Sequence, residues 1–168
     1  MGGKIGGDSL RLSSEKLRFL EERAWAALRD SALPERRNVF LSFAYEDIDE
    51  VNLLRGQART ENSNLEFNDW SVSEPFNSEN AEYIRRGIRE RIRQASVTLA
   101  YVSEHTAQSK WVDWEIRESI ALGKGVIAVY KGDTPPTRLP AACHEFNVKV
   151  VPWNQQEIAR AIEDAAMQ

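Results

Sequence analysis

The 168-residue sequence contains one cysteine, Cys143, and two histidines, His105 and His144. A single cysteine excludes an intrachain disulfide and gives no reason to expect an oxidising compartment. His105 is far in sequence from the adjacent Cys143 and His144, and no residues have the spacing of a zinc site. We therefore predict neither a metal nor a bound cofactor.

Long apolar runs and an excess of positive charge are also missing. No run is long enough to span a bilayer, and the Gly-rich residues 1–7 lack the apolar region of a signal peptide. The formal net charge of -4 provides no general attraction to phosphate backbones or anionic lipid. The sequence thus predicts a cytoplasmic protein with neither nucleic acid nor a membrane as a partner.

Several motifs of common enzyme classes are absent. There is no G-x-x-x-x-G-K-[ST] loop, no G-x-G-x-x-G after the first predicted strand and no G-x-S-x-G elbow. A phospho-receiver needs an acidic pair after its first strand, which Glu46 and Asp47 could form, and an aspartate at the end of its third. The third strand here ends in Val102, Ser103 and Glu104, so aspartyl phosphorylation has no acceptor.

Apolar runs and amphipathic segments alternate along most of the chain. Buried strands are predicted at 38–43, 65–69, 96–102, 125–130 and 148–151, and helices at 48–59, 79–94, 110–120 and 155–167. This alternation predicts an α/β three-layer sandwich with a five-stranded parallel sheet of flavodoxin-like order 2-1-3-4-5. Residues 43–47 and 103–110 should then meet at the switch point between the first and third strands.

Residues 1–36 form a predicted extension to this domain of residues 37–168. One amphipathic helix should run from Ser13 or Ser14 to about Asp30, with Leu17 and Leu20 on its apolar side. That side needs a partner, which could be the main domain, a second copy or another protein. The helix and the loop 70–78, a long connection with two aromatics that we expect to be exposed, are the predicted surfaces for self-association.

The predicted helix 79–94 is rich in arginine. Its basic residues could mark a nucleic-acid face, but glutamates are interleaved with them at three- and four-residue spacings. We interpret the helix as a solvated, salt-bridged surface. The residues involved are Arg85, Arg86, Arg89, Arg91 and Arg93, with Glu79, Glu82 and Glu90.

Trp111 and Glu115 are the candidate functional pair. In a helix over 110–120, Val112, Ile116, Ser119 and Ile120 share a buried stripe, and Trp111 and Glu115 lie on the neighbouring ridge. A crossover helix begins beside the carboxyl ends of the strands, where open α/β sheets bind ligands. We predict that Glu115 reaches this crevice. The alternatives are a solvent-facing Glu115, paired with Lys110 or Arg117, and a Trp111 that only packs beneath the sheet's end.

Three stretches resemble one protein family. They are NVFLSFAYED at 38–47, ASVTLAYVS at 95–103, and SKWVDWEI at 109–116 followed by Ser119, Ile120, Gly123 and Lys124. Residues 38–130 resemble the TIR family, and more narrowly the ThsB-type TIR-like proteins of bacterial Thoeris antiphage defence. The third stretch is the most specific. A bare W-x-x-x-E occurs by chance in many helices, whereas one flanked by this predicted strand and this Gly-Lys ending does not.

The resemblance implies cleavage of NAD⁺ as substrate, by a glycohydrolase or cyclase that makes a cyclic ADP-ribose-type signal. An effector protein would be reached through this diffusible nucleotide. Glu115 would be the catalytic glutamate and Trp111 its aromatic neighbour. Phe43 and Ala44 would lie by the nucleotide, and the loop that contains Trp70 would gate the site. The alternative is a non-catalytic TIR-like protein-interaction module.

Overall fold

The computed structural model describes residues 13–30, 37–60, 65–69 and 75–168. The chain divides into two compact units, Met1–Glu35 and Arg36–Gln168. In the first unit, the predicted amphipathic helix is present as α1 (Ser14–Asp30). Leu17, Leu20 and Trp25 of α1 are exposed, and the partner of its apolar side stays a prediction.

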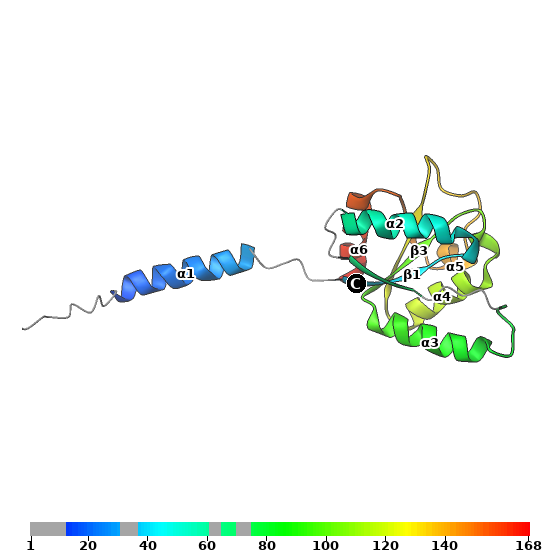
Figure 1. Cartoon of the computed structure of the whole chain (residues 1–168), viewed down its shortest axis with the longest axis horizontal. Helices are drawn as coiled ribbons and strands as arrows, with labels where there is room; N and C mark the ends of the chain where they lie inside the picture. Colours follow the sequence, from blue (N-terminus) through cyan, green and yellow to red (C-terminus); the bar gives the residue numbers. More distant parts are fainter. Residues whose placement is uncertain (1–12, 31–36, 61–64, 70–74) are drawn as a thin grey trace, which may run out of the picture. The chain divides into compact units, whose positions relative to one another are not determined.

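The second unit contains one parallel sheet of five strands (Figure 1). The strand order is β2-β1-β3-β4-β5, and all four neighbouring pairs are parallel. This arrangement confirms the predicted fold class and strand order. The strands are β1 (Arg37–Ser42), β2 (Leu65–Asp69), β3 (Val97–Tyr101), β4 (Gly125–Tyr130) and β5 (Lys149–Pro152).

Helices cover both faces of the sheet. Figure 1 shows α2 and α6 on one side and α3 and α4 on the other. These four helices were predicted; the short α5 was not, because a helix of five residues is too short to establish a periodic pattern. The helices are α2 (Ile48–Thr60), α3 (Ala81–Gln94), α4 (Lys110–Ala121), α5 (Ala141–Glu145) and α6 (Gln155–Ala166).

The alternation of side chains along β1 connects these two layers. Val39 and Leu41 belong to the apolar cluster formed with α2 and α6, whereas Phe40 packs with Ile88 and Ile92 of α3. Successive side chains of a strand point to opposite faces, so Ser42 lies on the same face as Phe40. The last residue of β1 therefore presents a hydroxyl to the side covered by α3 and α4.

Both ends of α4 are fixed by local signals. The Ser109 hydroxyl accepts a hydrogen bond from the Val112 amide at 3.3 Å and caps the first turn. Gly123 adopts a φ of 74° just after the helix, a conformation that glycine reaches without steric cost. The Lys124 amide then donates to the Ser119 carbonyl at 2.9 Å, so α4 is anchored in a fixed register between β3 and β4.

The arginine-rich α3 forms the predicted ion pairs. It buries Ile88 and Ile92 and leaves Tyr83 exposed. Ile84 is partly buried and packs against the apolar cluster that includes Ile88 and Ile92. Three ion pairs lie along the helix: Arg85 with Glu82 at 3.6 Å, Arg89 with Glu82 at 3.4 Å, and Arg93 with Glu90 at 3.5 Å.

Within the described part of the chain, no helix combines the length and the apolar character needed to cross a membrane.

Candidate functional site

Glu115 is buried between α4 and the end of β1. Its side chain is on the inward face of the helix and the residue is only 3% exposed. The Ser42 hydroxyl donates a hydrogen bond to Glu115 Oε2. A buried carboxylate is costly unless hydrogen bonds replace its water, and Ser42 supplies one such bond. Glu115 is thus part of the buried stripe and is not the solvent-facing residue of the alternative interpretation.

A second polar contact lies one turn further along α4. The Ser119 hydroxyl donates to the Glu115 carbonyl oxygen at 2.7 Å and lies 2.8 Å from the Thr98 hydroxyl of β3. Because Ser119 donates to the carbonyl, Thr98 is the donor in the second bond. Both hydroxyls are fully buried. We call Ser42, Thr98, Glu115 and Ser119 the polar seam between the sheet and α4.

Trp111 lines a cavity at the carboxyl edge of the sheet. The cavity has a volume of about 530 Å³. It is lined by Tyr45, Glu46, Pro75, Phe76, Glu104, His105, Gln108, Ser109, Lys110 and Trp111. Residues 43–47, 103–110 and the start of α4 were expected to gather here, and the structure brings them together. Glu115 is not among the lining residues, and it follows Trp111 by about 6 Å along the helix axis.

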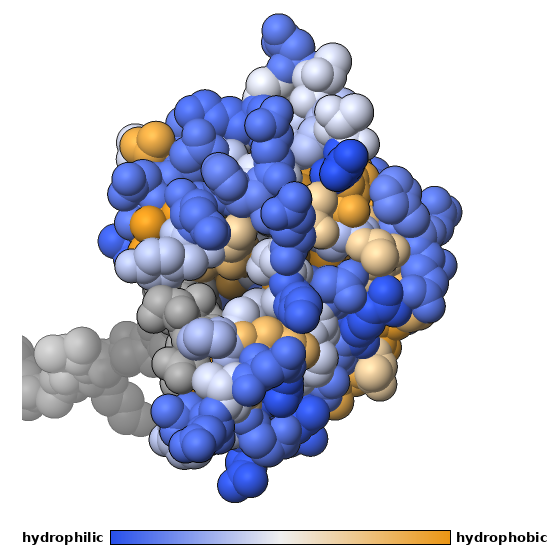
Figure 2. Space-filling view, turned by 90° about the vertical axis from the view of Figure 1, so that its right-hand side faces the viewer, coloured by the Kyte–Doolittle hydropathy of each residue, from blue (hydrophilic) through white to orange (hydrophobic). Residues whose placement is uncertain are grey.

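Figure 2 views this edge of the molecule from the right-hand side of Figure 1. Hydrophilic side chains dominate this face, and apolar residues are exposed only in separate patches around a hollow near the middle (Figure 2). A mainly polar rim around a hollow fits a polar ligand better than an extended apolar partner.

Three aromatic rings pack edge to face beside the cavity. The ring of Phe76 lies 4.9 Å from that of Trp111 at an interplanar angle of 73°, and Trp111 lies 6.0 Å from Trp114 at 86°. Such T-shaped pairs add to the stabilisation that burial provides. Phe76 is half-buried in this cluster, which corrects the expectation that both aromatics of the loop 70–78 are exposed; Trp70 lies outside the described residues.

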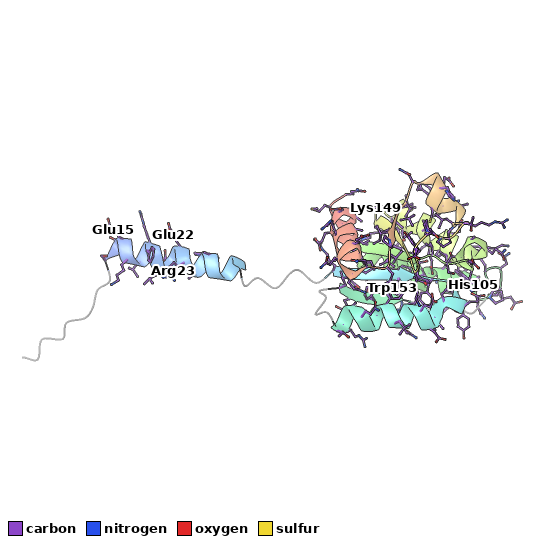
Figure 3. All side chains as sticks on the ribbon, turned by 90° about the horizontal axis from the view of Figure 1, so that it is seen from above. Glu15, Glu22, Arg23, His105, Lys149 and Trp153 are labelled. Carbon is purple, nitrogen blue, oxygen red and sulfur yellow. The ribbon has the colours of Figure 1, made fainter. Side chains whose placement is uncertain are left out.

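A carboxylate and a hydroxyl join the segment that follows β1 to the segment that follows β3. The Ser103 hydroxyl donates to Asp47 Oδ2 at 2.6 Å and accepts from the His105 amide at 3.0 Å. Burial raises the pKa of Asp47 above its ordinary value, although the Ser103 hydrogen bond and His105 oppose this shift. Figure 3 shows His105 near this edge and Lys149, which begins β5, toward the opposite one.

Phe43 and Ala44 were predicted to lie beside a nucleotide. Ala44 is buried immediately before the 3₁₀ turn η1 (Tyr45–Asp47). Phe43 is half-buried and packs against the apolar cluster that includes α2 and α6. In this segment it is Tyr45 and Glu46 that line the cavity.

Metal and thiol chemistry have no candidate in the described residues. Across 13–30, 37–60, 65–69 and 75–168, no three His, Cys, Asp or Glu side chains are grouped closely enough to hold a metal ion. Cys143 is buried, and burial, with a smaller effect of Asp113, raises the pKa of its thiol to about 11. The thiolate is the nucleophile, so the raised pKa of Cys143 disfavours its nucleophilic form at neutral pH.

Sequence reasoning did not assign a role to Ser42, Phe76 or Arg85. The sequence did contain a signal for Ser42. It is a polar residue at the end of an apolar strand, and it follows Leu41, so its side chain points to the opposite face of the sheet from that of Leu41. Phe76 belongs to a loop already marked as long. Arg85 was interpreted as one of several surface arginines. Two arginines of α3 in fact face α4: Arg85 contacts all three rings, and Arg89 contacts Trp114 and pairs with Glu118 at 2.7 Å.

The chain matches one protein family over more than half of its length. Residues 40–135 match the family described as Thoeris protein ThsB, TIR-like domain. No curated protein sequence matches the chain.

Two solved structures are similar in fold. One comprises the TIR domains of the activated Roq1 resistosome, described as directly recognizing the pathogen effector XopQ, at 17% identity and a TM-score of 0.42, covering 78% of this chain and 84% of that chain. The other is a 3-dehydroquinate dehydratase-like protein from Bifidobacterium longum, at 9% identity and a TM-score of 0.39, covering 78% of this chain and 96% of that chain. Both are too distant to bear on function.

Proposed function

The chain belongs to the family of Thoeris ThsB proteins, defined by a TIR-like domain, and from this premise we propose that it cleaves NAD⁺ as a glycohydrolase or cyclase. One observation carries the proposal. Glu115 is a buried carboxylate, hydrogen-bonded by Ser42, at the carboxyl edge of a parallel sheet. It follows by one helical turn the indole of Trp111, which lines a cavity of about 530 Å³.

The cleavage of NAD⁺ requires only one carboxylate at the reacting carbon. The nicotinamide of NAD⁺ is cationic and leaves as a neutral molecule when the bond between its ring nitrogen and the ribose carbon breaks. The electron pair of that bond stays on nicotinamide, so no general acid is needed. The ribose develops oxocarbenium-like positive charge, which a fixed carboxylate stabilises, as in glycoside hydrolysis. Glu115 is the carboxylate to which we assign this role.

The neighbouring residues would orient the reactants. Ser42 holds one oxygen of Glu115, which limits rotation of the carboxylate. Trp111 offers a flat apolar wall against which a nucleotide ring could stack and from which water is excluded. A substrate would have to approach past Trp111, because Glu115 does not itself line the cavity.

The product depends on which nucleophile attacks the ribose carbon after nicotinamide leaves. Attack by water gives ADP-ribose and one proton, whereas attack by a nitrogen of the substrate's own adenine gives a cyclic ADP-ribose-type molecule and one proton. A cavity that excludes water favours cyclisation. We propose that the cyclic product is a diffusible signal, made in antiphage immunity, that acts on a separate effector protein.

Nicotinamide release tests the proposal directly. Purified protein is incubated with NAD⁺ over a range of protein concentrations, so that any dependence on assembly is sampled, and products are separated by chromatography and identified by mass. For Glu115→Gln we expect the rate to fall about 100-fold or more, because the negative charge is lost from the developing cation. Glu157→Gln, an exposed change of identical chemistry on α6, is the matched control and should keep the wild-type rate.

The outcomes that contradict the proposal are distinct. Equal rates for wild type and Glu115→Gln would remove Glu115 from the reaction. A wild type that releases no nicotinamide at any protein concentration would contradict NAD⁺ cleavage itself.

A non-catalytic interaction module is the second candidate, and one observation favours it. Glu115 is 3% exposed and bonded to Ser42, as expected of a carboxylate that only ties α4 to β1. Under this alternative, Ser42→Ala and Glu115→Gln change the stability of the fold, and neither the wild type nor the variants bind NAD⁺ in a calorimetric titration. NAD⁺ binding by the wild type would count against the module.

A further inference from the structure

Arg85 on α3 lies against the whole aromatic cluster. Its guanidinium carbon is 4.3 Å from the ring centroid of Phe76, 5.7 Å from that of Trp111 and 6.0 Å from that of Trp114. The side chain is 19% exposed. A guanidinium within about 6 Å of an aromatic centroid is attracted by the ring quadrupole, and more strongly when water is excluded. Arg85 therefore has an attractive contact with each of the three rings.

Arg85 also holds the backbone that carries the first of these rings. Its Nη2 donates to the Phe76 carbonyl oxygen at 2.9 Å, and Nη1 lies 3.6 Å from Glu82 Oε2. Glu82 lies three residues earlier on the same helix, so this ion pair helps to orient the guanidinium relative to α3. One side chain of α3 is thus bonded to the loop that follows β2 and packed on the first turns of α4.

The rings under Arg85 lie between two hollows. Phe76 and Trp111 line the cavity of about 530 Å³. Phe76 and Trp114 line a neighbouring one of about 330 Å³. The orientations of Phe76 and Trp111 define part of the wall of the larger cavity, and Trp114 packs edge to face against Trp111 from the side of the smaller one. Any group that fixes these rings therefore fixes the shape of the space available to a substrate.

We propose that Arg85 is a positioning residue that fixes the Trp111 indole as a wall of the larger cavity. The kinetic part of this inference rests on the proposed function. Glu115 takes a hydrogen bond from Ser42 of β1, whereas Arg85 donates to the Phe76 carbonyl and packs on the rings of Phe76 and Trp111. Arg85 thus governs how well NAD⁺ fits, while Glu115 governs how fast the bond breaks.

Arginine is required because of its shape as well as its charge. The planar guanidinium can stack on a ring and donate to a carbonyl in the same orientation, whereas the lysine ammonium is a compact, strongly hydrated charge. Arg85→Lys should retain part of the effect, and Arg85→Gln should lose it. Arg86→Gln is the matched control, because Arg86 is the next residue of the same helix and is exposed.

The experiment has two independent readouts. The first is the near-ultraviolet circular dichroism of the ligand-free protein, which reports the asymmetric packing of tryptophans; far-ultraviolet spectra confirm that each variant is folded. The second is KM and kcat for NAD⁺. For Arg85→Gln we expect a weakened tryptophan signal and a KM raised about tenfold, with kcat changed by less than about threefold. Arg85→Lys should fall between Arg85→Gln and wild type, and Arg86→Gln should match wild type.

Each outcome decides the proposal. An unchanged tryptophan spectrum in Arg85→Gln overturns it, as does a fall in kcat at constant KM. If Arg85→Gln does not fold, the same two readouts on Arg85→Lys decide. If the wild type releases no nicotinamide, the proposed function fails and the spectra alone decide: a weakened signal in Arg85→Gln but not in Arg86→Gln supports the positioning role, and equal spectra refute it.

Discussion

On the face of the sheet covered by α2 and α6, β1 and β3 contribute Val39, Leu41, Val97 and Leu99 to one apolar cluster. The same two strands present Ser42 and Thr98 to the opposite face, where the polar seam with Glu115 and Ser119 lies. Apolar burial stabilises a fold without directionality. Buried polar groups require defined partners, and the face that contains them is the one next to the cavity.

This difference suggests that the two faces of the sheet have different roles: the apolar face under α2 and α6 stabilises the fold, and the polar face next to α4 carries the chemistry. Exchange of a side chain in the α2 and α6 layer should change how much folded protein is present without changing what each folded molecule does. Exchange in the polar seam should change what each folded molecule does, and it should cost less stability than the loss of a large apolar core side chain. Three predictions test this division, beginning with the largest effect on the free energy of unfolding.

Leu99→Ala should have the largest effect. Leu99 is fully buried in the middle of β3, so its truncation removes apolar contacts and leaves a cavity, at a cost of about 2–5 kcal/mol. The free energy of unfolding from urea titrations measures this loss. Leu53→Ala on α2, where the leucine is 59% exposed, is the control and should cost less than about 0.5 kcal/mol. Equal losses at the two sites would contradict the proposed division.

Ser42→Ala should lower the free energy of unfolding by a smaller amount. A hydrogen bond to a charged group contributes about 1.5–3 kcal/mol, and this variant removes the one that Ser42 donates to Glu115. The double variant with Glu115→Gln should cost less than the sum of the two single changes, because both act on the same bond. Combination of Ser42→Ala with Glu157→Gln should be additive. Additive costs in both combinations would show that the contact between Ser42 and Glu115 does not contribute to the free energy of unfolding.

Asp47→Asn should alter the pH dependence more than the magnitude of stability. The folded pKa of Asp47 is raised above 3.8, so the folded protein retains a proton that the unfolded chain releases. The free energy of unfolding therefore falls as the pH rises from 3.8 through the folded pKa. At higher pH the buried Asp47 carboxylate is charged and the protein stays less stable by that amount.

The asparagine variant cannot be deprotonated. Its stability relative to wild type should consequently increase with pH across that window, as measured by urea titrations at a series of pH values. Asp49→Asn, an exposed change of the same chemistry two residues along, is the control. A difference between Asp47→Asn and wild type that stays constant with pH would contradict the raised pKa.

Much of the fold could be predicted from local pattern. The apolar runs from 38 to 151 and the helices between them determined the number of strands, and the alternation of strands and helices favoured the parallel order. The position of Trp111 at the start of a crossover helix then placed it at the carboxyl edge. These inferences succeed because periodicity and connectivity are properties of contiguous residues.

The sequence by itself determined the α/β architecture and the helix that carries Trp111 and Glu115. The tertiary structure decided which way Glu115 turns and that a hydroxyl 73 residues away is its donor. It also decided that Arg85 of α3 contacts all three rings, while Arg89 contacts Trp114 alone among them. The physical reason is that a helix offers several faces of similar polarity. Only the register between α3, α4 and β1 selects the side chains that come within bonding distance.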